Sequence, residues 1–122
     1  MMARKKENLK MPTPPDFTIV FLGQEPFDKN GVAYTRYRYS VDVPARLNII
    51  TRPRVNTSKP GVTFISKQKR TFKAFYGGKR NDLPTWFFEL PADVVPPSWV
   101  YLDVKTPAPV QEYKSNLAET TL

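Results

Sequence analysis

The sequence has no cysteine and no histidine among its 122 residues. These absences exclude disulfides, zinc sites built from Cys and His, thiol nucleophiles and every Ser-His or Cys-His catalytic pair. Acids are also scarce, with 11 Asp and Glu against 19 Lys and Arg. The groups that remain as acids or bases, which are Asp, Glu, Lys and Tyr, form no catalytic pattern. We therefore expect a non-enzymatic protein that holds no metal and no cofactor.

Long apolar runs are missing as well. Nowhere do 18 apolar residues follow one another, so we expect no transmembrane helix and no membrane partner. The first seven residues carry a net positive charge, but prolines follow them instead of an apolar stretch, and we expect no secretory signal peptide. These features predict a protein of the cytoplasm or of a virion.

Glycine is rare and proline is abundant, with five of the former and 13 of the latter. A proline inside a helix removes a backbone donor and costs about 3 kcal/mol, so long helices are disfavoured. Leu, Ile, Val and Phe supply 31 residues, which exceeds the roughly 20% below which disorder is the default. The composition therefore predicts a small all-β domain with a hydrophobic core.

Three zones follow one another along the chain. A basic, Pro-containing arm covers 1–16, a β domain covers 17–104, and a C-terminal tail covers 105–122, with a weakly helical stretch at 111–119. Within the domain, runs of β-branched and aromatic residues alternate with turn-forming residues. The expected strands are 17–22, 32–43, 47–51, 62–66, 70–76, 86–90 and 98–104. About seven strands indicate a single antiparallel sandwich or barrel with extended N- and C-terminal arms.

The strand expected at 32–43 has the clearest pattern. Its tyrosines and valines alternate with polar and basic residues, as in a half-buried antiparallel strand. Asn30 and Gly31 precede it and tolerate positive φ angles, so we expect the strand at 17–22 to fold back onto it. A second hairpin connection is expected at 66–69.

The positive charge is concentrated in the middle of the chain. Residues 43–82 hold ten bases and one acid, whereas residues 83–122 hold two bases and five acids. A basic segment of this kind repels itself unless an anion compensates it, and nucleic acid is the commonest such partner. The candidate nucleic-acid-binding residues are Arg36, Arg38, Arg52, Arg54, Lys67, Lys69, Arg70, Lys73, Lys79 and Arg80. We predict that those beyond residue 50 form one continuous positive surface.

Aromatic residues are interleaved with these bases. Tyr34 and Tyr76 are candidates for stacking on unpaired bases, as in single-strand binders. The competing interpretation places most aromatic rings in the core and treats edge-strand Lys and Arg as protection against aggregation. The run 76–80 (YGGKR) lacks the spacing, the Ser or Thr and the helix of a phosphate loop, so we expect a mobile β loop there.

Two principal functions fit these features, and both are analogies at the level of the fold. The first is a structural component of a large assembly, such as a viral or phage capsid, head or cement protein, with homo-oligomeric neighbours. Its arm would contact those neighbours, and its basic surface would contact DNA, RNA or an acidic partner. The basic residues of the arm are Arg4, Lys5, Lys6 and Lys10.

The alternative is a free, OB-like single-strand-binding β-barrel. A small regulator that binds one protein partner is a third interpretation. Termini of this composition are poorly ordered unless something holds them. The arms therefore favour the structural component of a large assembly.

Overall fold

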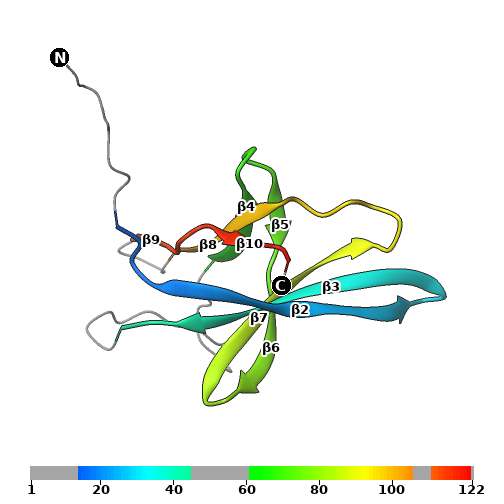
Figure 1. Cartoon of the computed structure of the whole chain (residues 1–122), viewed down its shortest axis with the longest axis horizontal. Coiled ribbons are helices and arrows are strands. Elements are labelled where there is room, and N and C mark those ends of the chain that lie inside the picture. Colours follow the sequence, from blue (N-terminus) through cyan, green and yellow to red (C-terminus); the bar gives the residue numbers. More distant parts are fainter. Residues whose placement is uncertain (1–13, 45–60, 106–110, 122) are drawn as a thin grey trace.

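The computed structural model describes residues 14–44, 61–105 and 111–121. Within these ranges the chain forms nine β-strands and no helix, which confirms the expected all-β class. The named strands pair antiparallel in two sheets (Figure 1). The strand expected at 47–51 lies outside the described residues.

The two sheets have four and five strands. The four-stranded sheet has the order β2 (Thr18–Lys29), β3 (Val32–Asp42), β7 (Leu83–Pro91) and β6 (Phe75–Arg80). The five-stranded sheet has the order β10 (Ala118–Glu119), β8 (Trp99–Lys105), β4 (Gly61–Ser66) and β5 (Thr71–Lys73), with β9 (Glu112–Lys114) also paired to β8.

The first hairpin forms as the sequence predicts. Asn30 and Gly31 have φ angles of 54° and 82°, and they connect β2 to β3 as a two-residue turn. However, β2 extends to Lys29, beyond the expected end at Leu22. A bulge between Phe21 and Gly23 shifts the register and allows pairing with β3 to continue.

The connection between β4 and β5 also confirms its prediction, with a hydrogen bond from Lys69 N to Ser66 O (2.8 Å). The prediction of a mobile loop at 76–80 is wrong, because these residues belong to β6. Asn81 and Asp82, with φ angles of 51° and 66°, form the turn to β7 instead. Both residue types tolerate the left-handed conformation better than most.

The single strand expected at 70–76 is divided between the sheets. β5 pairs with β4 in one sheet, and β6 pairs with β7 in the other. The chain passes from one sheet to the other at Ala74, which lies between the two strands and packs against the core. This crossing joins the sheets at one corner.

The prediction of a short helix within 111–119 is wrong. These residues form β9 and β10, and both pair with β8 along the same edge. The link between them is held by Ser115, whose Oγ accepts a hydrogen bond from Leu102 N (2.8 Å). A nine-residue helix is marginal in water, whereas the edge of β8 offers backbone partners. Residues 112–119 thus complete the five-stranded sheet.

The start of β2 forms a second corner with the C-terminal segment. Phe17 makes a parallel bridge to Ser115. The Asn116 side chain accepts a hydrogen bond from Ile19 N (2.8 Å) and donates one to Ile19 O (3.2 Å), as a strand partner would. With corners on both sides, the sandwich is barrel-like.

An aromatic cluster fills the space between the sheets. Tyr39, Phe64 and Phe88 are fully buried, and their rings contact one another with centroids 5.1–6.2 Å apart. Phe72 stacks on Phe88 at 5.0 Å. The alternation predicted for residues 32–43 is confirmed here, because Tyr37, Tyr39 and Val41 lie in this core.

Candidate functional site

The outer face of the four-stranded sheet combines cations with aromatic rings. The Arg36 guanidinium lies 4.0 Å from the centre of the Phe27 ring and 4.8 Å from that of Phe87. Arg36 Nε is 3.5 Å from Glu89 Oε2, and Lys29 Nζ is 3.2 Å from Glu89 Oε1. Glu89 thus neutralises two bases, and Arg36 is held between two rings and a carboxylate.

Arg38 lies on the same face of β3 and is buried, with its side chain 8% exposed. It donates hydrogen bonds to both carboxylate oxygens of Glu25 (3.1 and 3.0 Å), to Gly77 O (3.0 Å) and to Thr85 Oγ1 (3.2 Å). The hydrogen bond from Arg38 is the main reason that the pKa of Glu25 lies below its ordinary value, and Arg80 at 2.8 Å adds to it. The Arg38 guanidinium is used within the protein and links β2, β3, β6 and β7.

The two candidate stacking residues have different surroundings. Tyr34 lies half-buried on the outer face, with its ring 5.7 Å from that of Phe27 and 5.2 Å from Lys29 Nζ. Tyr76 packs against the core and contacts Trp86 at 5.6 Å. Of the two rings, only that of Tyr34 belongs to the outer face.

The other candidate bases fall into separate groups. Lys67, Lys69, Arg70 and Lys73 are exposed on the β4–β5 hairpin, whereas Lys79 and Arg80 are exposed beside the β6–β7 turn. These two hairpins point to opposite sides of the molecule (Figure 1). The described residues therefore form two basic groups instead of one continuous surface. Arg52, Arg54, Arg4, Lys5, Lys6 and Lys10 lie outside the described residues.

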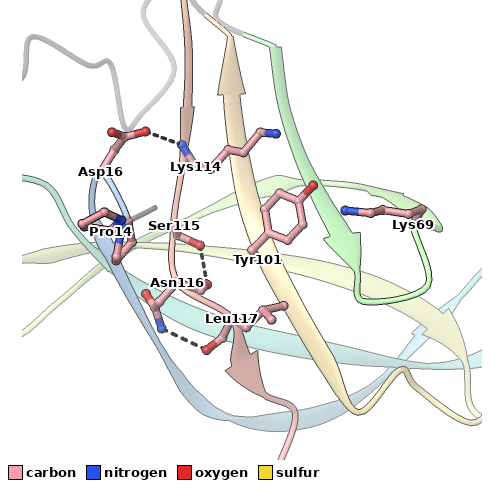
Figure 2. A pocket seen from close by; sticks show the side chains of 9 residues that line it. Pro14, Asp16, Lys69, Tyr101, Lys114, Ser115, Asn116 and Leu117 are labelled. Carbon is pink, nitrogen blue, oxygen red and sulfur yellow. Dashed lines mark hydrogen bonds between the residues drawn. The ribbon is translucent and has the colours of Figure 1, made fainter. Parts of the chain in front are cut away.

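A pocket on the five-stranded sheet brings one of these bases to a site that the sequence did not reveal. It has a volume of about 830 Å³ and lies between Pro14–Asp16, Tyr101 on β8 and the segment 114–117. The lysines on its two flanks come from different elements, Lys69 from the β4–β5 turn and Lys114 from β9 (Figure 2).

Both lysines lie close to the Tyr101 ring. Lys69 Nζ is 5.6 Å and Lys114 Nζ is 5.9 Å from its centre, within reach of a cation–π contact. Among the described residues, no ion pair involves either ammonium group. The pocket therefore places a half-buried aromatic ring beside two lysine ammonium groups.

The sequence missed this site because its parts are distant from one another. Tyr101 stands in the run 99–102, in which every residue is apolar or aromatic, and Lys114 stands in the acidic third of the chain. The alternation of inward and outward side chains along β8 was the one signal in the sequence that could have placed Tyr101 on the outer surface. Val100, Leu102 and Val104 are in the core, which turns Tyr101 outward.

A buried carboxyl group lies near this pocket on the same strand. Asp103 is 3% exposed, pairs across the sheet with Lys114, and its Oδ1 has no hydrogen-bond partner among the described residues. The pKa of Asp103 is raised to about 7, chiefly by burial and in part by the neighbouring Glu112, while Lys105 and Lys114 oppose the shift. A hydrogen bond from Asp103 lowers the pKa of Glu112. The two carboxyl groups therefore share one proton near neutral pH.

Two further features concern the part of the chain that the structure describes. It contains no group of three or more His, Cys, Asp or Glu residues that could hold a metal ion. It also contains no helix of the length and apolarity needed to cross a membrane.

Known proteins provide no template for this chain. No protein-family model matches it, and neither a curated protein nor a solved structure shows significant similarity to it. A proposal for its function therefore rests on the charges and contacts of the described residues.

Proposed function

We propose that this chain is a non-enzymatic structural component of a large assembly, of the kind found in viral or phage capsids, heads or cement layers. It contacts neighbouring copies through its N-terminal arm and an anionic partner, nucleic acid or an acidic protein, through basic residues. The observation that carries this proposal is the attachment of residues 14–17 to the C-terminal segment.

That attachment consists of two hydrogen bonds between Asp16 and the backbone of Lys114. Asp16 N donates to Lys114 O (2.8 Å), and Lys114 N donates to Asp16 Oδ2 (2.9 Å). Terminal residues of isolated domains are poorly ordered unless something holds them. The basic segment that precedes Pro14 therefore starts from a fixed point, which an arm that reaches a neighbour requires.

The same corner of the molecule collects basic charge. Lys69 and Lys114 line the pocket with Pro14, and covalent continuity attaches a segment with four bases and one acid at this point. The exposed Lys67, Arg70 and Lys73 extend the basic group along the β4–β5 hairpin. Such a concentration of charge suits an anionic polymer or an acidic neighbour.

The alternative function is that of a free single-strand-binding β-barrel, related in architecture to OB-like proteins. The Tyr101 ring, with two lysine ammonium groups close to it, favours it, because single-strand binders combine stacking rings with basic grooves. The oligomeric state separates the two functions, since a free binder does not depend on contacts between copies.

Deletion of residues 1–13 tests the proposed assembly role. We expect the full chain to self-associate and the truncated chain to remain monomeric with the same β-sheet circular dichroism, because Asp16 and its contacts are retained. Sedimentation velocity at several concentrations measures this difference. A full-length variant with Arg4, Lys5, Lys6 and Lys10 changed to Gln is the matched control, and it separates the charge of the arm from its length.

Unchanged association of the truncated chain would contradict the arm contact. A full chain that stays monomeric at every concentration and binds single strands tightly would favour the alternative.

A further inference from the structure

The pocket beside Tyr101 has a wall that suits a flat, apolar ring. Tyr101 is half-buried on β8, and Leu117 beside it is 43% exposed, which makes it one of the few large apolar side chains left open among the described residues. Pro14 and Pro15 form a further apolar part of the lining. A volume of about 830 Å³ lies within the range of small-ligand sites. The shape and lining can therefore accept a heteroaromatic ring with attached groups.

The charges of the lining favour an anion at its rim. Lys69 and Lys114 contribute two positive charges, and Asp16 contributes the one carboxylate among the lining residues. An oxygen of that carboxylate already accepts the backbone N–H of Lys114. The side chains of the two lysines extend to the Tyr101 ring from different elements (Figure 2). A ligand that stacks on the ring would thus have two cations close to it.

We propose that this pocket binds one unpaired nucleotide of a single-stranded nucleic acid. The base stacks on Tyr101 beside Leu117, and the adjoining phosphates contact Lys69 and Lys114. This inference rests on the proposed function, because it names the ligand class and the contact point of the anionic partner.

The remaining polar groups of the pocket indicate little sequence preference. Asn116 uses its amide on Ile19 and Leu117, and Ser115 uses its hydroxyl on Leu102 and Asn116. These side chains have few donors or acceptors left with which to read base edges. Recognition therefore depends on stacking and charge, which tolerate every base.

A single strand fits this site better than a duplex or an acidic peptide. A base that is stacked and paired within a duplex cannot also stack on a protein ring. An acidic peptide would use the two lysines but would gain little from the ring. The aromatic ring beside the two cations is therefore the feature that distinguishes these ligands.

Fluorescence anisotropy with a labelled ten-nucleotide oligo(dT) provides the test, with the full chain at low salt. We expect Tyr101→Leu to weaken binding about tenfold and Tyr101→Phe to retain it, because the ring carries the contact. Lys69→Gln and Lys114→Gln should each weaken binding and reduce the salt dependence by about 0.7 in the slope of log K against log salt. Lys79→Gln is the matched control, since it removes the same charge on the β6–β7 hairpin.

The outcomes distinguish the pocket from the wider proposal. A wild-type chain that binds neither single-stranded nor duplex DNA at low salt overturns both the inference and the nucleic-acid contact. Binding that is equal for Tyr101→Leu and wild type, or equal for duplex and single strand, overturns the pocket alone. Displacement by poly-glutamate that depends on the lysines and not on the ring would assign an acidic peptide instead. Lys69→Gln changes an exposed turn residue and keeps the test valid if Tyr101→Leu fails to fold.

Discussion

Replacement of Gly77 by alanine is expected to destabilise the fold by about 3 kcal/mol, although this glycine does not have a positive φ angle. A Cβ atom at this position would overlap Arg38 Nη1 and would lie only 2.8 Å from Thr85 Oγ1 and 3.1 Å from Phe87 Cδ2. The guanidinium of Arg38 occupies the space that a side chain at Gly77 would need. Gly77 therefore supports the fold by leaving room for a buried cation.

The expected size of the effect follows from what Arg38 would lose. The displaced guanidinium would give up its hydrogen bonds to Gly77 O and Thr85 Oγ1 and strain its pairing with Glu25. Buried polar groups left without partners cost about 1–3 kcal/mol each, and breaking a buried ion pair costs about 3–5 kcal/mol. Glu25 is partly exposed, so the value expected here lies at the lower end.

Urea unfolding of the variant and wild type measures this effect, with Gly61→Ala as the matched control. A Cβ at Gly61 would lie 3.8 Å from Lys105 Cβ, an ordinary contact, so its free energy of unfolding should change by less than about 0.5 kcal/mol. In an Arg38→Met background the Gly77→Ala change should cost much less, because the flexible methionine has no fixed hydrogen bonds to lose. Equal effects of Gly77→Ala and Gly61→Ala would contradict this account.

The same cluster shows where sequence reasoning about the outer face ends. The alternation of residues 32–43 correctly placed Tyr37 and Tyr39 inward, and it also turned Arg36 and Arg38 outward. It could not show that Glu25, Glu89 and Gly77 meet these arginines, because the contacts join four strands. A base on a polar face therefore looked like a ligand contact, whereas Arg38 is a buried link.

The two corners of the fold could not be predicted from the sequence for a related reason. Local propensity predicts strands and tight turns, and the Asn30–Gly31 turn was found in this way. It does not predict which sheet a strand joins, so the break at Ala74 and the pairing of 112–119 with β8 were missed. The Tyr101 pocket depends on that pairing and on the approach of residues 14–16, and the sequence therefore could not reveal it.

Acidification from pH 8 to pH 5 is expected to raise the free energy of unfolding by roughly 2 kcal/mol. Burial raises the pKa of Asp103 from an ordinary 3.8 to about 7 in the folded chain. The folded state thus binds more protons than the unfolded state between about pH 4 and pH 7, and its stability falls as pH rises through this window. Glu112 has its pKa lowered, so its own contribution is lost mainly below pH 5.

The absence of histidine simplifies the interpretation of this pH dependence, because no imidazole titrates between pH 5 and pH 8. Asp103→Asn should remove most of the pH dependence, since the amide stays neutral and can still donate to Glu112. Glu112→Gln should reduce the dependence, because it removes the neighbouring charge that raises the pKa of Asp103. Asp28→Asn, at an exposed carboxylate on β2, is the control and should keep the wild-type profile.

Urea unfolding at each pH gives the four profiles, and the α-amino group contributes equally to all of them. A wild-type stability that is level across this range, or a slope that survives in Asp103→Asn, would show that the buried carboxyl group does not hold a proton near neutral pH. If the slope is present and is lost in Asp103→Asn, protonation of Asp103 stabilises the folded state, in which β8 pairs with β9. Because Lys114 lies opposite Asp103 in that pairing and on the flank of the Tyr101 pocket, the charge beside the pocket would then change with pH as well.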